Sequence, residues 1–285
     1  MSASRRLHAP RCITIAVTSG KGGVGKTNVV INLAIALARL RHRVAILDAD
    51  FGLGNVDVLL GLAPSAHLGH VLAGEKSLSE VMVPGPLGVQ VIPASSGVRA
   101  LTALNASHWD TIARSFAAIA DQFDYLIIDT AAGISNNVID ATGFAEHVLV
   151  VTSLEPTAVV DAYAVIKVLS TDGPTRPLGL LVNNVRDAQE AHLVFSQLEV
   201  ATDRFLRRRL DYYGFVASDA AVHEAVLVQR PVVDHLPQSA ASRCFRILAS
   251  RIAGSDPPRG QGLHLVASRA AATPPVSSTE TTQCA

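Results

Sequence analysis

Short runs of apolar, often β-branched residues alternate with longer segments of helical periodicity along most of the chain. Several short runs, such as YLIID at 125–129 and HVLVVT at 147–152, are almost entirely apolar, as strands are when helices cover both faces of a sheet. This alternation is typical of repeated βαβ units. It predicts an α/β fold with a single doubly wound, mostly parallel sheet of about seven or eight strands and helices on both faces.

The positions of the elements follow from the same pattern. We expect strands at Ile13–Val17, Arg43–Asp48, Val89–Pro93, Tyr125–Asp129, His147–Thr152, Leu178–Asn183 and Tyr213–Val216. We expect helices at Asn28–Leu40, Trp109–Gln122, Pro156–Ser170, Ala188–Leu210 and Ala240–Ala253.

The amino-acid composition of the chain changes near residue 255, where segments rich in Pro, Ser and Thr begin. Such segments contain few side chains that can pack into a core. The sequence therefore predicts three parts: a short basic arm at residues 1–11, one domain at residues 12–254, and a disordered tail at residues 255–285.

Composition narrows the class of protein. Of the 285 residues, 49% are hydrophobic and 17% are charged, which allows a sizeable core and excludes wholesale disorder. The formal net charge is zero, so no global field attracts nucleic acid or an anionic membrane. The cysteines Cys12, Cys244 and Cys284 are few and far apart, which favours a reducing compartment. With no long apolar run for a signal peptide or a membrane span, we expect a cytoplasmic protein.

The segment GKGGVGKT matches the phosphate-loop pattern G-x-x-x-x-G-K-[ST], and it lies between an expected strand and an expected helix. Glycines let backbone N–H groups curve around phosphate oxygens, and the helix N-terminus adds partial positive charge. Lys26 is expected to hold the β- and γ-phosphates, and the Thr27 hydroxyl is expected to bind Mg²⁺. The predicted nucleotide-binding residues are Gly20, Lys21, Gly22, Gly23, Val24, Gly25, Lys26 and Thr27.

A second lysine, Lys21, directly follows the first glycine of the loop, where the pattern requires no cation. One interpretation is a solvated surface lysine. The other is a cation that reaches the phosphates bound by a second, facing copy and offsets transition-state charge, as an arginine finger does in trans.

Three aspartates follow apolar strands. Asp48 ends the second expected strand, Asp50 follows it two residues later, and Asp129 ends the fourth strand. All three therefore lie at the carboxyl edge, where ligands bind in doubly wound folds. Taken singly, each could be a simple strand-end cap. Together with the phosphate loop, Asp48 and Asp129 are candidate groups for the magnesium shell, and Asp50 is the candidate to orient the attacking water.

Several segments carry a family resemblance. GKGGVGKT, LDADFGLGNVDVLLGL and IIDTAAGIS resemble the deviant Walker A, A′ and B segments of the MinD/ParA ATPase family. The segments DAD-GLGNVDVLLGL, EPTAVVDAYAVIKVL, LLVNNVRDAQEA and VQRPVVDHLPQSAASRCFRILA resemble a narrower branch, the flagellar-number regulators called FlhG or FleN. The resemblance spans about Ile13 to Ala253, so it implies a MinD-like P-loop ATPase domain.

The resemblance implies a slow cytoplasmic ATPase that uses ATP and Mg²⁺ and forms a face-to-face homodimer when ATP is bound. It implies catalytic roles for Lys21, Lys26 and Asp50, with Lys21 acting on the nucleotide of the partner. It also implies that Asn183 reads adenine. The implied partners are the flagellar GTPase FlhF and the transcription activator FleQ, and the implied outcome is control of flagellar number, placement or gene expression. Peripheral contact with the cell membrane or cell pole is a further expectation, whereas specific DNA binding is not expected.

Two other functions fit parts of the pattern. A ParA-like DNA- or cargo-partitioning ATPase would bind nonspecific DNA through clustered basic residues, but the neutral net charge speaks against it. A metabolic kinase or ligase of the same wider fold would need a substrate domain, for which the chain offers no segment.

Some segments leave alternatives open or depart from the family. Only MSASRRLHAPR precedes the first expected strand, whereas some relatives begin with a glutamine-rich activating helix. After the seventh expected strand, the segment GFVASDAAV lacks the proline that relatives usually have in the loop near the adenine. RFLRRRL at 204–210 is either the solvated face of a long helix or a DNA or partner patch. His67 and His70 have ligand-like spacing but no further Cys or His nearby in sequence.

A membrane helix has two candidate segments. GLHLVASRAAA in the tail is short and weakly apolar. The other candidate also has the pattern of a final helix packed on the sheet, with an apolar stripe formed by Ala241, Cys244, Phe245, Leu248 and Ile252.

Overall fold

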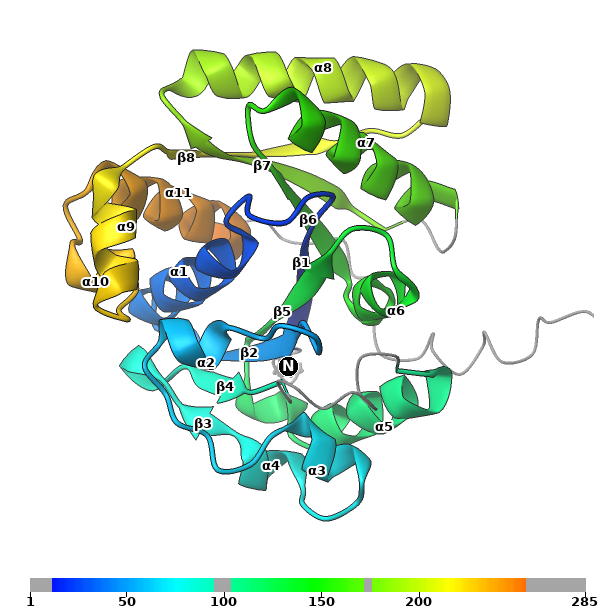
Figure 1. The fold of residues 1–285 in the computed structure, drawn as a ribbon, viewed down its shortest axis with the longest axis vertical. Coiled ribbons are helices and arrows are strands. Elements are labelled where there is room, and N and C mark those ends of the chain that lie inside the picture. Colours follow the sequence, from blue (N-terminus) through cyan, green and yellow to red (C-terminus); the bar gives the residue numbers. More distant parts are fainter. Residues whose placement is uncertain (1–11, 95–103, 172–175, 255–285) are drawn as a thin grey trace, which may run out of the picture.

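The computed structural model describes residues 12–94, 104–171 and 176–254 (Figure 1). Its core is an eight-stranded sheet with the order β3-β4-β2-β5-β1-β6-β7-β8. Neighbouring strands are parallel except for the β3–β4 pair. The predicted fold class is therefore confirmed. The strands are β1 (Ile13–Ser19), β2 (Val44–Ala49), β3 (Val83–Pro84), β4 (Gln90–Ile92), β5 (Tyr125–Ala132), β6 (His147–Thr152), β7 (Leu178–Val185) and β8 (Asp211–Ala217).

Helices cover both faces of this sheet, with α1 and α9 to α11 on one face and α5 to α8 on the other (Figure 1). The longer helices are α1 (Lys26–Arg39), α5 (Ala106–Ala117), α6 (Asn136–Phe144), α7 (Pro156–Thr171), α8 (Ala188–Leu206), α9 (Ala220–Leu227) and α11 (Ala240–Gly254). The short ones are α2 (Val56–Leu59), α3 (Leu68–Leu72), α4 (Leu78–Val81), α10 (Val232–His235) and the 3₁₀ turns η1 (Pro86–Gly88) and η3 (Ala120–Gln122).

The alternation of side chains along each strand decides which of them face α1. Side chains alternate between the two faces of a strand, and residues in register on parallel neighbours share a face. Ile46 of β2 and Ile127 of β5 are paired in register and belong to the core cluster formed around α1. Two residues further on, Asp48 and Asp129 are again in register. Both carboxylates therefore lie on the α1 face, at the end of the sheet where α1 begins.

The helix expected at Ala188–Leu210 is four residues too long, because α8 ends at Leu206. Arg207 adopts a left-handed backbone conformation (φ 51°), which ends the helix, and the Arg208 guanidinium folds back to donate to the Arg176 carbonyl. The RFLRRRL segment is therefore not one face of a long helix. Only its first three residues are helical.

Helix α6 was not predicted, because its sequence NNVIDATGF includes two asparagines and a glycine, which have low helix propensity. Packing compensates for this propensity. Val138, Ala141 and Phe144 are buried on α6, and the helix lies against β5 and β1. Tertiary burial therefore decides the conformation of this segment.

Helix α11 is a packed core helix. Phe245, Leu248 and Ile252 are buried in the same cluster as the apolar face of α1. Of the two interpretations of this stripe, the packed helix is the one observed. The second membrane candidate, GLHLVASRAAA, lies outside the described residues, as do the expected arm at 1–11 and the expected tail at 255–285. Within the described ranges, no helix is long and apolar enough to cross a membrane.

Candidate nucleotide site

The phosphate loop occupies the turn between β1 and α1, as the sequence predicted. Gly23 (φ 81°) and Gly25 (φ 88°) adopt the left-handed conformation that favours glycine. Gly20 packs so closely on α7 that an added Cβ would lie 2.2 Å from the Asp161 carbonyl oxygen. The loop can therefore follow this path only with small residues at these positions.

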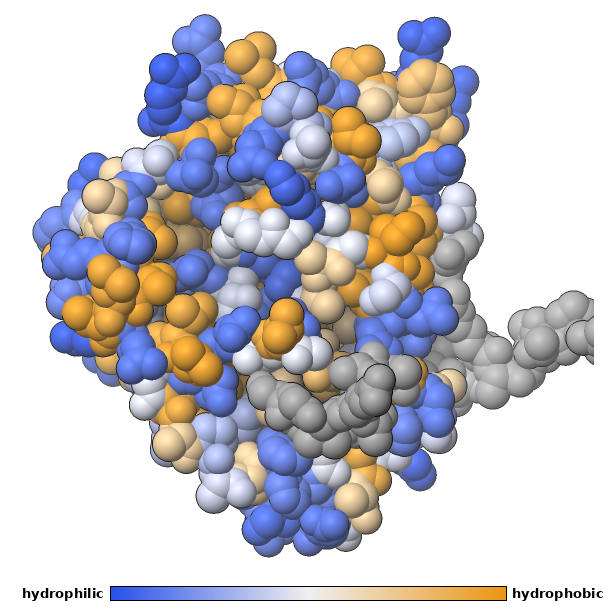
Figure 2. All heavy atoms as spheres, viewed as in Figure 1, coloured by the Kyte–Doolittle hydropathy of each residue, from blue (hydrophilic) through white to orange (hydrophobic). Residues whose placement is uncertain are grey.

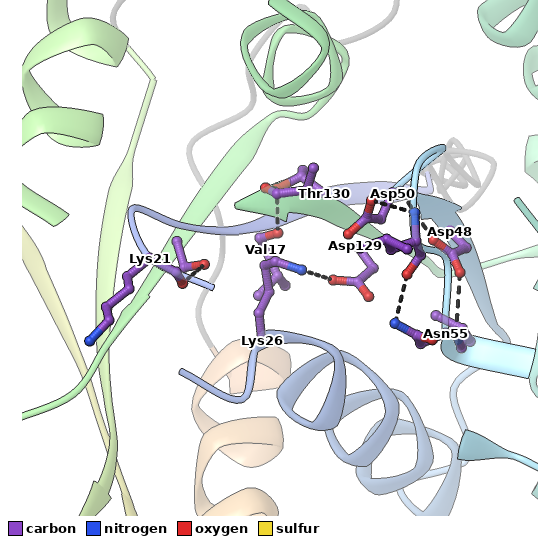
Figure 3. A network of polar contacts seen from close by, with 12 residues as sticks. Val17, Lys21, Lys26, Asp48, Asp50, Asn55, Asp129 and Thr130 are labelled. Atoms are coloured by element: carbon purple, nitrogen blue, oxygen red, sulfur yellow. Dashed lines mark hydrogen bonds and ion pairs between the residues drawn. The ribbon is translucent and has the colours of Figure 1, made fainter. Parts of the chain in front are cut away.

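Lys26 and Thr27 open α1 beside the end of β5. The Lys26 Nζ donates to Oδ1 of Asp129 at 2.9 Å, and both side chains are buried (Figure 3). Burial raises the pKa of Asp129, whereas Lys26 and the Thr27 hydroxyl act in the opposite direction. The second carboxylate oxygen of Asp129, Oδ2, is buried and has no hydrogen-bond partner. The fold thus brings Lys26, Thr27 and Asp129 together as the sequence predicted.

Asp48 lies beside Asp129 and holds the loop that follows β2. Its Oδ1 accepts from the Asp50 N–H at 3.1 Å, and its Oδ2 accepts from the Val56 N–H at 3.2 Å (Figure 3). Gly54 lies so close that an added Cβ would be 2.8 Å from Asp48 Oδ2. Burial, followed by the charge of Asp129, raises the pKa of Asp48 to about 8. A nearby cation would favour ionisation of both carboxyl groups.

Asp50 lies one residue beyond β2, on the loop next to Asp48. Its Oδ1 accepts from the Leu53 N–H at 3.2 Å, and its side chain is only partly buried. A carboxylate in this place can accept a hydrogen bond from a water molecule that approaches the phosphates.

Lys21 lies apart from this cluster and is directed away from Lys26 (Figure 3). Its Nζ lies 2.5 Å from Oε2 of Glu155 and 3.1 Å from the Thr157 hydroxyl. The sequence indicated a lysine free to swing outward, but it is paired with its own chain. Local sequence patterns did not indicate Glu155, because it lies 134 residues away from Lys21 in the chain.

A cavity of about 340 Å³ extends from the phosphate loop to the ends of β7 and β8. Val216, Phe245 and Asp219 line its far end, together with Asn183. The Asn183 amide donates to the Val24 carbonyl at 2.7 Å, which ties the end of β7 to the phosphate loop. Asn183 thus lines the same cavity as the phosphate loop. Its assignment to adenine stays a prediction.

The residues present suit a hard cation. Carboxylate and hydroxyl oxygens are the ligands that Mg²⁺ prefers, and Mg²⁺ is usually bound by one or two carboxylates together with substrate phosphates. The Oδ2 atom of Asp129, which has no hydrogen-bond partner, is an available metal ligand of this kind. Within the described ranges no group of three or more His, Cys, Asp or Glu side chains forms a metal cluster, so phosphates would have to complete the site. His67 and His70 instead contact each other as a helix cap.

The chain is similar in sequence to known proteins. A family model described as AAA domain matches residues 12–171. The antiactivator FleN of Pseudomonas aeruginosa is 44% identical over 238 residues, which are 84% of this chain and 85% of FleN. The flagellum site-determining protein YlxH of Helicobacter pylori is 32% identical over 213 residues, 74% of this chain and 72% of YlxH.

Solved structures show the same fold. The septum site-determining protein MinD from Pyrococcus horikoshii, solved in complex with Mg-ADP, has a TM-score of 0.72 at 22% identity. The match covers 85% of this chain and 96% of that chain.

The fold and the phosphate loop define a P-loop nucleotide-binding protein of the AAA-domain class. The chain belongs to the MinD/ParA-type ATPase family, in the branch of flagellar-number regulators that contains FleN and YlxH. This membership supports ATPase activity in general.

Proposed function

We propose that this protein is an ATP-dependent dimerising switch that regulates flagellar number, placement or gene expression. ATP and Mg²⁺ bind at the phosphate loop, two chains pair through this face, and slow hydrolysis to ADP and phosphate separates them. Dimerisation or a partner protein stimulates the hydrolysis.

The observation that carries the proposal is that the two lysines of the phosphate loop occupy different environments. Lys26 is buried against Asp129, in position to meet phosphates bound by its own chain. The Lys21 side chain is 38% exposed and lies on the rim of the cavity. A cation on the rim can reach a nucleotide held by a facing copy, where it would offset transition-state charge.

Segments at the edge of the sheet that carries the phosphate loop expose apolar side chains. Leu53 is 76% exposed, Ile134 53% and Val160 67%. They lie in the segments that follow β2, β5 and β6, all of which end at the edge of the sheet that carries the phosphate loop. Apolar groups are visible among polar ones on the surface in Figure 2. Exposed apolar side chains around a ligand site favour burial against a partner, here a second copy.

Within each site we assign three tasks. The loop backbone and Lys26 hold the phosphates, while Thr27, Asp48 and Asp129 hold Mg²⁺ directly or through water. Asp50 orients the attacking water. The Mg-ADP in the Pyrococcus horikoshii MinD complex supports the use of nucleotide and magnesium by this fold.

The flagellar role is supported by the two relatives, one named an antiactivator and the other a flagellum site-determining protein. We propose the transcription activator FleQ and the GTPase FlhF as the partners. The protein would act in the cytoplasm, with peripheral contact at the inner face of the membrane or at the cell pole.

Counting flagella in cells that lack the gene tests the role. A changed number or position is expected, and complementation with the intact gene should reverse it. An unchanged count would remove the flagellar assignment and favour a partitioning ATPase, which salt-sensitive, ATP-dependent retention on DNA would then reveal.

A further inference from the structure

Lys26 has an electrostatic task besides phosphate binding. Asp48 and Asp129 are each 1% exposed, they lie side by side in register, and they face the same side of the sheet. Lys26 is 8% exposed and contacts Asp129 from the first turn of α1. A buried cation thus pairs with one member of this pair of buried acids, as burial of charge requires.

The contact of Lys26 is one-sided. Its Nζ lies 2.9 Å from Oδ1 of Asp129, while Oδ2 of the same carboxylate is buried without a partner. Asp48 uses both of its oxygens to accept backbone N–H groups. The ammonium therefore covers one of the oxygens that a metal ion would need and leaves the other unused.

We infer that Lys26 is an internal counter-ion that keeps free divalent cations away from Asp48 and Asp129 until a nucleotide arrives. The phosphates then attract the ammonium, Asp129 is released, and the metal enters together with the nucleotide. This inference rests on the magnesium site of the proposed function, and it assigns an order to the filling of that site.

Two physical effects favour this order. A positive charge at hydrogen-bonding distance from Asp129 repels a second cation strongly where water is largely excluded. Mg²⁺ also gives up its water reluctantly and needs near-ideal octahedral oxygen ligands, which two carboxylates alone do not supply. Nucleotide phosphates remove both obstacles, because they provide oxygens and a competing site for the ammonium.

The test is a titration of the full chain with Mn²⁺ in the absence of nucleotide. Electron paramagnetic resonance measures the Mn²⁺ that stays free in solution. We expect Lys26→Met to bind Mn²⁺ at least about tenfold more tightly than the wild type, because the acids lose their counter-ion. Lys26→Arg, which keeps the charge, should resemble the wild type. Lys21→Met is the matched control, since Lys21 contacts neither aspartate, and it should also resemble the wild type.

A further arm separates this inference from the proposed function. If the wild type with ATP binds more Mn²⁺ than the same ATP does without protein, but Lys26→Met without nucleotide binds no better than the wild type, the counter-ion role is wrong and the magnesium site stands. If the wild type with ATP binds no more Mn²⁺ than ATP alone, the magnesium site itself is wrong. Circular dichroism melting checks that each variant folds, and Lys26→Gln replaces Lys26→Met if the latter does not.

Discussion

The ammonium of Lys21 lies 2.5 Å from the carboxylate of Glu155 in the same chain. The lysine that we assign to the partner's nucleotide is thus held by the residue that precedes α7 in its own chain. The side chains are 38% and 65% exposed, so the pair is solvated and weak. Lys21 can therefore leave Glu155 for a phosphate group at small cost.

Glu155→Gln should release Lys21 and favour dimerisation. Because exposed ion pairs contribute less than about 1 kcal/mol, the ATP concentration that gives half-maximal dimerisation should fall by less than about fivefold. Light scattering during an ATP titration measures this. Loss of dimerisation in Glu155→Gln would show instead that Glu155 belongs to the dimer interface.

Asp50→Ala should trap the dimer. Without the carboxylate that orients water, hydrolysis should fall by about 10² or more, while ATP and metal binding persist. Phosphate release and gel filtration with ATP measure the two effects. Asp57→Ala, a half-buried aspartate on α2, is the control and should hydrolyse ATP at the wild-type rate. Normal turnover in Asp50→Ala would remove the assignment of Asp50.

Asp219→Ala should destabilise the fold by about 2 kcal/mol, since a helix cap is worth about 1 kcal/mol and this side chain serves two helices. Asp219 accepts from the Ala221 N–H of α9 and from the Ala241 N–H of α11, each at 3.0 Å. Urea unfolding at pH 7 measures the loss. Asp203→Ala, an exposed change on α8, should stay within about 0.5 kcal/mol of the wild type.

The contribution of Asp219 should also depend on pH. The hydrogen bond from Ala241, followed by other backbone N–H groups, lowers the pKa of Asp219. A carboxyl group with a lowered folded-state pKa stabilises above its unfolded value of about 3.9 and loses this contribution as the pH falls through the folded value. The difference between wild type and Asp219→Ala should therefore shrink below about pH 4.

His147 should make stability fall in mild acid. It is buried at the start of β6 with an unpartnered Nε2, and burial lowers its pKa, although Asp211 acts in the opposite direction. The unfolded chain then binds more protons than the folded chain below about pH 6.5, so the free energy of unfolding decreases as the pH falls. Urea unfolding at pH values from 7.5 to 5 should show that the free energy of unfolding depends less steeply on pH in His147→Gln than in the wild type. The control His223→Gln, at an exposed position, should keep the wild-type slope.

Much of the site could be predicted because its signals are local. The phosphate loop is a contiguous segment, and Asp48 and Asp129 end apolar strands whose order in the chain indicates a parallel sheet. Alternation along β2 and β5 then requires both carboxylates to share a face. These relationships depend on backbone geometry, which the sequence pattern specifies well.

The unpredicted parts depend on contacts between distant segments. The pairing of Lys21 with Glu155 joins residues 134 positions apart, and Asp219 reaches α11 across 22 residues. The early end of α8 depends on the left-handed backbone of Arg207, an uncommon conformation for arginine. Local propensity does not specify any of these.

The central claim is that each site is completed by Lys21 of the partner. ATP hydrolysis by an equimolar mixture of Lys21→Gln and Asp50→Ala tests it most directly. In a mixed dimer, the Lys21→Gln chain keeps its own Asp50 and receives Lys21 from the Asp50→Ala chain, so one site is intact. We expect each variant alone to be nearly inactive and the mixture to regain activity well above either. A mixture as inactive as its components, with mixed dimers present, would contradict the account.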